Sequence, residues 1–74
     1  MAYWEENRVM TCAKCGKVNY VLIACSGDSR ANEWEEASCF NCKVGVCRAE
    51  CWVIIAAASA DKAGQQLRTI QGRE

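Results

Sequence analysis

Two C-x-x-C pairs, a strand-rich segment between them and an alanine-rich amphipathic stretch near the C-terminus predict a small, metal-stapled α+β fold. The pairs are Cys12 with Cys15 and Cys39 with Cys42. The chain has 74 residues, and a chain this short buries too little apolar surface to be stable without a staple. We therefore expect one domain, residues 1–74.

Seven cysteines in so short a chain indicate either a disulfide scaffold or a metal site. The number is odd, and the opening Met1-Ala-Tyr-Trp-Glu-Glu carries acids where a secretory signal peptide has basic residues. The paired C-x-x-C spacing is typical of metal ligands. These features favour a metal staple and a reducing, cytoplasmic location.

Composition excludes several classes of function. The chain has no His, so metal sites that combine cysteine with histidine ligands and His-dependent catalysis are excluded. Nine basic residues balance nine acidic ones, and four thiolates with one Zn2+ would bring the charge to about −2. Because most nucleic-acid modules are clearly basic, this balance counts against nucleic-acid binding. The longest apolar run, 51–60, is shorter than the roughly 20 residues that cross a bilayer, so we expect no membrane partner.

The segment between the cysteine pairs is predicted to be a hairpin. Residues 18–25 are rich in β-branched and aromatic side chains and predict a strand. Turn formers fill 26–32, and 33–38 would be the returning strand. Pairing of these two strands would bring the cysteine pairs together, so 12–45 is expected to be the metal-binding ribbon.

Residues 1–11 are expected to be a lead-in whose Tyr3 and Trp4 pack on the chain's own domain. In so small a core, Trp4, Trp34 and Trp52 are expected to be packing anchors rather than platforms on which bases stack.

Residues 46–74 are expected to form a strand, a helix or both. Two interpretations of 44–55 stay open: a third strand, or a helix that begins near Arg48. A helix over at least 56–70 is favoured by an apolar stripe of helical spacing. The stripe consists of Trp52, Ala56, Ala60, Ala63, Leu67 and Ile70. Gly72 is expected to be the C-terminal cap.

Paired C-x-x-C is the strongest signal in the sequence. Four thiolates in a tetrahedron suit Zn2+ or, less often, iron. A shell of four protein ligands leaves no open position for water or substrate, so the site would be structural. The predicted ligands are Cys12, Cys15, Cys39 and Cys42.

Three features together resemble the zinc-ribbon family: Cys12-Ala-Lys-Cys15-Gly16, the strand-turn-strand over 18–38, and Cys39-Phe-Asn-Cys42. The resemblance covers about residues 10–45 and implies a zinc-ribbon β-hairpin holding a structural zinc on the four paired cysteines.

The sequence departs from the zinc-ribbon pattern at Lys43, where that family usually has Gly, and this leaves the geometry of the second turn open. A treble clef, with the second pair at the start of a helix, is one alternative. The rubredoxin family, which holds iron on similar turns, is another, although it typically carries Pro and Gly in the second turn.

The other cysteines, Cys25, Cys47 and Cys51, are expected to be small buried hydrophobic residues. The alternative is a second metal site, or a different shell in which Cys47 and Cys51 join the second pair.

The expected function is that of a non-enzymatic interaction module with a structural zinc, which binds another protein as an adaptor or inhibitor. A second copy of the same chain is one partner that this expectation includes. The apolar stripe would offer the docking surface. The first alternative is a nucleic-acid-binding zinc ribbon acting through Arg8, Lys14 and Lys17, which the acidic segment 28–36 would oppose. The second alternative is a rubredoxin-like iron electron carrier.

Overall fold

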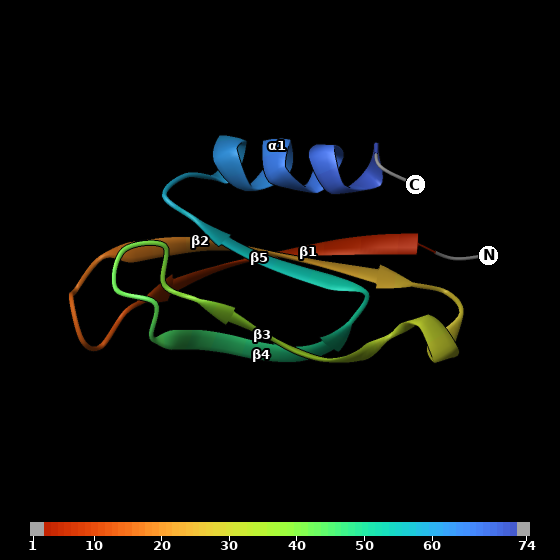
Figure 1. Cartoon of the computed structure of the whole chain (residues 1–74), viewed down its shortest axis with the longest axis horizontal. Coiled ribbons are helices and arrows are strands. Elements are labelled where there is room, and N and C mark those ends of the chain that lie inside the picture. Colours follow the sequence, from red (N-terminus) through yellow and green to blue (C-terminus); the bar gives the residue numbers. More distant parts are fainter. Residues whose placement is uncertain (1–2, 73–74) are drawn as a thin grey trace.

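The computed structural model describes residues 3–72, which form three layers (Figure 1). The helix lies over a three-stranded sheet of strand order β1-β2-β5, and a two-stranded sheet, β3-β4, lies on the other side. All strand pairs are antiparallel. In chain order the elements are β1 (Tyr3–Thr11), β2 (Val18–Ser26), a 3-10 turn (Ser29–Ala31), β3 (Glu33–Ser38), β4 (Gly45–Cys51), β5 (Val53–Ala57) and α1 (Ala60–Gln71).

Strand β2 lies at the centre of the structure. Its residues 21–25 are all buried, because one side of the strand faces α1 and the other faces β4. A strand covered on both faces carries a continuous apolar run rather than an alternating one, and this explains the sequence Val-Leu-Ile-Ala-Cys.

The predicted hairpin between 18–25 and 33–38 is wrong, although both strands exist. β2 pairs with β1 and β5, whereas β3 pairs only with β4, in the other sheet. The turn that joins β2 to β3 therefore passes from one layer to the other. Asn32 fixes this crossing: its Nδ2 donates to the Ser26 carbonyl at 2.8 Å, and its Oδ1 accepts from the Ser26 amide at 3.0 Å.

The terminal segments also differ from expectation. The lead-in is strand β1, which pairs with β2 along its whole length. Residues 44–55 are mainly strand, so the helix that would begin near Arg48 is wrong. The helix begins only at Ala60, because Ser59 caps it: the Ser59 side chain accepts from the Lys62 amide at 3.2 Å. The cap at Gly72 is confirmed, with its amide donating to the Arg68 carbonyl at 2.9 Å.

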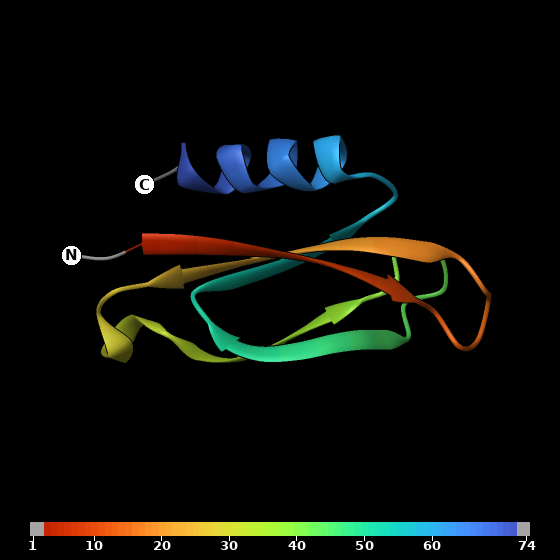
Figure 2. The same cartoon turned by 180° about the vertical axis from the view of Figure 1, so that it is seen from behind.

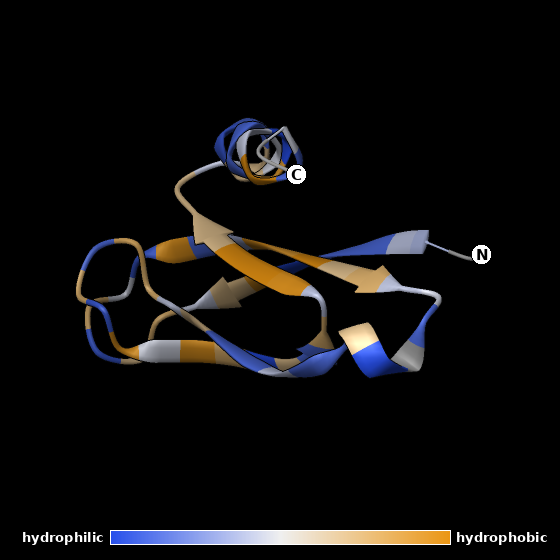
Figure 3. Cartoon of the chain, turned by 45° about the vertical axis from the view of Figure 1, so that its right-hand side comes forward, coloured by the Kyte–Doolittle hydropathy of each residue, from blue (hydrophilic) through white to orange (hydrophobic). Residues whose placement is uncertain are grey.

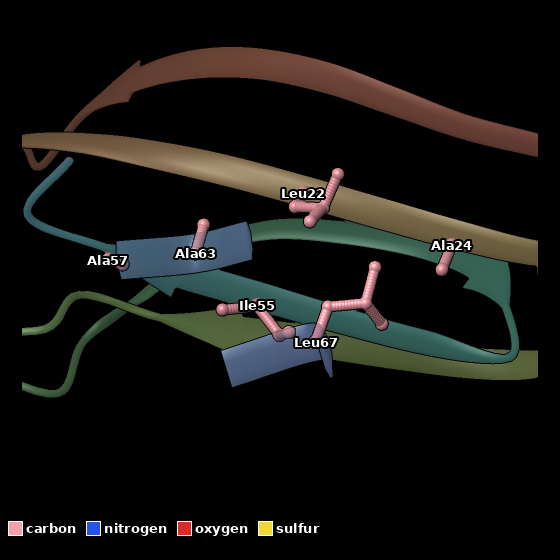
Figure 4. Close-up of a cluster of buried hydrophobic side chains, with 6 residues drawn as sticks. All are labelled: Leu22, Ala24, Ile55, Ala57, Ala63 and Leu67. Carbon is pink, nitrogen blue, oxygen red and sulfur yellow. The ribbon is translucent and has the colours of Figure 1, made fainter. Parts of the chain in front are cut away.

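The apolar stripe is divided between strand and helix. Ala56 is in β5, Trp52 precedes it, and only the later members are helical. Those at Ala63 and Leu67 are buried against the sheet. This upper core consists of Leu22, Ala24, Ile55, Ala57, Ala63 and Leu67 (Figure 4). Figure 3 views the helix nearly end-on, with its hydrophobic side turned to the sheet. Leu67 is only 3% exposed, so the expected docking surface is part of the chain's own core.

A second core lies between the two sheets. It contains Cys25, Cys47 and Cys51 beside Val21 and Ile23. The three cysteines are therefore buried small hydrophobic residues, as expected. Burial raises the pKa of the Cys51 thiol to about 11.

A single residue, Trp52, turns the chain from the lower sheet into the upper one. It separates β4 from β5, and its amide donates to the Ala24 carbonyl at 2.9 Å. Its ring packs against the upper core. Trp52 is thus a packing anchor, but the same expectation is wrong for Trp34 and Trp4, which are 62% and 50% exposed.

Within residues 3–72, no helix is long and apolar enough to cross a membrane.

Candidate metal centre

The two cysteine pairs meet at one end of the molecule, where both hairpins turn. Residues 12–17 join β1 to β2, and residues 39–44 join β3 to β4; both views show these loops side by side (Figures 1 and 2). We call these loops the first and second knuckle. Because each loop belongs to a different sheet, any metal held by both would link the two layers.

The structure brings the four predicted ligands together. The Sγ atoms of Cys12, Cys15, Cys39 and Cys42 all lie within 4.8 Å of one another. Cys12 Sγ is 3.3 Å from Cys42 Sγ, and Cys15 Sγ is 3.6 Å from Cys39 Sγ. One cysteine of each knuckle is buried and the other is half-buried.

The donor set and its spacing fit a tetrahedral metal ion. A Zn–S bond of about 2.3 Å gives sulfur–sulfur edges of about 3.8 Å in a regular tetrahedron. The two sulfur–sulfur distances given above, 3.3 Å and 3.6 Å, are close to that value, and none of the seven cysteines forms a disulfide. Among residues 3–72, no other His, Cys, Asp or Glu cluster of this kind occurs. The alternative shell with Cys47 and Cys51 is therefore not formed.

The two knuckles have the same backbone hydrogen bonds. In the first, the Cys12 amide donates to the Lys17 carbonyl at 2.9 Å and the Gly16 amide to the Cys12 carbonyl at 2.9 Å. In the second, the Cys39 amide donates to Val44 at 2.7 Å and the Lys43 amide to Cys39 at 3.0 Å. This equivalence fits the zinc-ribbon-like pair of turns. The treble-clef alternative is wrong, because strand β4 and not a helix follows the second pair.

The equivalence explains the departure at Lys43. Gly16 has φ of 76° and Lys43 has φ of 69°, so both follow their second cysteine in the left-handed region. Glycine adopts this conformation without penalty, whereas for a residue with a Cβ it costs about 1 kcal/mol or more. The second turn therefore has the same geometry as the first, with strain at Lys43.

Each knuckle also directs amides at its first sulfur. The Cys15 amide, then the Cys42 thiol and the Lys14 amide, lower the pKa of Cys12 below its ordinary value. The Cys42 amide, then the Asn19 side chain and the Asn41 amide, lower the pKa of Cys39 to about 6. Hydrogen bonds from N–H groups favour the thiolate, which is the form that binds metal.

Cys42 behaves differently because it faces other sulfurs. The Val44 amide lowers the pKa of Cys42, but the hydrogen bond with Cys12, burial and the other two thiols outweigh it and raise the pKa to about 11. Four thiols this close cannot all ionise without a cation between them. The first sulfur of each knuckle thus has a lowered pKa, which favours its thiolate form, and a bound cation would allow all four sulfurs to ionise together.

Sequence reasoning missed Asn19, which ties the two knuckles together. Asn19 is completely buried on β2. Its Nδ2 donates to the Lys17 carbonyl at 3.3 Å and to Cys39 Sγ at 3.4 Å, and its Oδ1 accepts from the Phe40 amide at 3.0 Å. The only signal available was an asparagine near the start of a strand that is mainly apolar.

The charges around the site differ slightly from those expected. Lys14 and Lys17 of the first knuckle are exposed, and Lys43 of the second adds a third cation at the same end. Arg8 does not belong to this group: it lies in the middle of β1, forms an ion pair with Glu6, and has its Nη1 3.9 Å from Cys47 Sγ.

Substitutions at the two left-handed positions should have opposite effects. Lys43→Gly relieves the backbone strain and should raise the free energy of unfolding by up to about 1 kcal/mol. Gly16→Ala should lower it by about 1 kcal/mol through the backbone alone, because a Cβ there has no atom within 4 Å. Denaturant unfolding of the metal-loaded protein measures both.

A control for these substitutions is available in α1. Gly64 is helical, so Gly64→Ala should stabilise by up to about 1 kcal/mol. If Lys43→Gly instead destabilised the protein, the shared backbone geometry would not set the stability of the knuckles.

Removal of the Asn19 side chain should weaken metal binding. Asn19→Ala leaves the Phe40 amide without its side-chain acceptor and takes a donor from Cys39 Sγ. Outer hydrogen bonds of this kind are worth about 10- to 100-fold in metal affinity. Competition with a chromophoric chelator measures the change. Asn41→Ala is the matched control, because that side chain is exposed and its backbone amide stays in place. Equal metal affinities for the two variants would show that the Asn19 side chain does not contribute to metal binding.

The chain was compared with protein families, curated proteins and solved structures, and none of them matches. The zinc-ribbon resemblance therefore rests on the two knuckles and on the four thiols that they bring together.

Proposed function

We propose that this chain is a non-enzymatic interaction module held together by a structural zinc ion on Cys12, Cys15, Cys39 and Cys42. The observation that carries the proposal is the four-thiol cluster, with one pair from each of two hairpins in different sheets. Such a shell uses all tetrahedral positions for protein ligands. The ion would therefore stabilise the fold and would leave no position at which a substrate binds.

Zinc is favoured over iron on two grounds. Shells of four cysteine thiolates are a common form of structural zinc site, and the second knuckle, Cys39-Phe-Asn-Cys42-Lys43, lacks the Pro and Gly typical of rubredoxins. Iron tetrathiolate is red and zinc tetrathiolate is colourless, so the colour of the purified protein separates the two.

A protein partner is favoured by the exposed parts of both sheets. In residues 3–72, each sheet has strands with an unpaired edge. Trp34 is largely exposed on β3, with the Arg48 guanidinium 5.1 Å from its ring centroid. Exposed aromatic and arginine side chains are typical of protein interfaces. The exposed acids Glu33 and Glu36 on the same strand would repel a nucleic-acid backbone.

Replacement of the paired cysteines should remove the metal and unfold the chain. Structural zinc supplies on the order of 10 kcal/mol in small domains, which is comparable to the whole stability of an ordinary domain. Single Ser substitutions at Cys12, Cys15, Cys39 or Cys42 should abolish or strongly weaken metal binding, as should a strong chelator. Native mass spectrometry gives the stoichiometry, and near-ultraviolet circular dichroism follows the tertiary structure.

The three core cysteines are the matched controls for this experiment. Ser substitutions at Cys25, Cys47 or Cys51 should lower stability but keep one zinc per chain, because these residues lie outside the cluster. Two metals per chain, or an unchanged thermal transition after complete zinc removal, would refute the structural role.

Nucleic-acid binding is a second candidate, favoured by the three exposed lysines at the knuckle end. Lys14, Lys17 and Lys43 surround a metal centre that would itself carry about −2, so their net effect on a phosphate backbone is small. We therefore expect weak, salt-sensitive binding without sequence preference in an anisotropy titration at physiological salt. Submicromolar affinity that is lost in the Lys14→Glu, Lys17→Glu double variant would make this the better proposal.

A further inference from the structure

Strand β1 forms a long open edge of the upper sheet. It pairs with β2 on one side and, within residues 3–72, with no strand on the other; Figure 2 shows it running in front of the molecule. All nine of its residues are exposed except Met10, which is half-buried. The exposed set includes Trp4 at 50% and Val9 at 63%. An open edge of this length is a template for another strand.

The pairing of β1 with β2 assigns each β1 side chain to a face. Directly paired residues in an antiparallel ladder point to the same side. Trp4, Glu6, Arg8 and Met10 lie opposite Cys25, Ile23, Val21 and Asn19, and therefore share the face that looks toward β4. Tyr3, Glu5, Asn7, Val9 and Thr11 share the face that looks toward α1. The Tyr3 hydroxyl, which accepts from Gln71 Nε2 of the helix at 2.9 Å, agrees with this assignment.

The order of side chains on the first face is self-complementary. It reads aromatic, acid, base, apolar from Trp4 to Met10. Read in the opposite direction, the same row places base against acid and apolar against aromatic. We propose that β1 pairs antiparallel with β1 of a second copy of this chain, about a two-fold axis through Asn7, which joins the two upper sheets into one.

This register follows from symmetry, length and charge. A two-fold axis perpendicular to the sheet pairs identical strands so that one residue lies directly opposite its own copy across the axis. Asn7 is the midpoint of β1, Tyr3–Thr11, so an axis there uses the whole strand. Axes at the neighbouring positions, Glu6 or Arg8, would place like charges directly opposite each other, which is unfavourable.

The Asn7 register gives every charged side chain on the β4-facing side a partner of opposite sign. Glu6 and Arg8 already form an ion pair along the strand. In the dimer, Glu6 of each copy also lies across from Arg8 of the other, so four charges alternate at the corners of a square. Trp4 lies across from Met10 at both ends of the row, which covers exposed aromatic surface.

This inference deepens the proposed function by naming a partner, and it rests on that proposal only because the metal holds the fold. The two fail separately. Loss of metal on substitution of the paired cysteines concerns the module, whereas the substitutions below lie on β1 and should leave one zinc per chain.

Charge reversal on β1 tests the pairing. Sedimentation velocity of the zinc-loaded full chain over a concentration series should show a monomer–dimer equilibrium. Glu6→Arg and Arg8→Glu each convert both ion pairs into like-charge contacts, and should each raise the dissociation constant by about tenfold or more. Mixing the two variants restores opposite charges at both positions, so a heterodimer of one chain of each should form. The double variant, with both substitutions in one chain, should dimerise like the wild type.

Glu5→Arg is the matched control. Glu5 lies on the other face and across from Val9 in this register, so its reversal should leave the dimer intact. Metal content and far-ultraviolet circular dichroism verify that each variant is folded. A wild-type chain that stays monomeric at all concentrations would overturn the proposal. The open edge of β1 would then be available for a strand of another protein. Single variants as dimeric as the wild type, or a mixture that stays monomeric, would overturn it as well.

Discussion

The meeting of two hairpin tips on four thiols is the constraint on which the rest of this structure depends. Each close sulfur pair, Cys12 with Cys42 and Cys15 with Cys39, joins one sheet to the other. The cores between the layers are thin. The upper one has three large aliphatic side chains, Leu22, Ile55 and Leu67, and is otherwise alanine. The free energy gained by burying such small cores exceeds the loss of chain entropy by little. A bound ion would therefore supply much of the net stability.

The cysteines serve two purposes that composition alone does not separate. Four converge at the knuckle end of the molecule, where backbone amides and Asn19 donate hydrogen bonds to sulfur. The other three fill the gap between the sheets beside Val21 and Ile23. Small side chains on β4 let the two-stranded sheet approach β2 closely. A cysteine in this layer therefore acts as a compact apolar residue, and its thiol pKa rises with burial, as at Cys51.

Sequence patterns predicted the local elements better than their pairing. The strands over 18–25 and 33–38, the Gly72 cap and the clustering of the paired cysteines all followed from residue types and spacing. The partner of each strand did not, because the continuous apolar run of β2 indicates that both faces are covered without saying by what. Helical spacing from Trp52 to Ile70 was misleading, since Trp52 lies at the corner before β5 and Ala56 lies in β5, where it packs against the core between the sheets.

Two site features were also beyond sequence reasoning. Lys43 carries no sign that it adopts a left-handed backbone, and only its equivalence to Gly16 in space shows why it does. Asn19 is separated from Cys39 and Phe40 along the chain, so its role depends on how β2 meets the second knuckle. The self-complementary order of side chains on β1 is visible in the sequence. It indicates strand pairing only once β1 is known to lie at the edge of a sheet.

The position of Trp52 has a consequence for how the molecule would open. The backbone joins the two sheets at this one-residue corner and at the turn between β2 and β3, both toward the end of the molecule opposite the knuckles (Figure 1). The two layers are thus connected through the backbone near Trp52 at one end and through the thiol cluster at the other. Without a metal on the four thiols, we expect the knuckle end to separate first, while the Trp52 amide keeps its hydrogen bond to the Ala24 carbonyl. Local opening should therefore be easiest at the knuckle end. The backbone amides at the two ends of β2 should accordingly exchange their hydrogens at different rates.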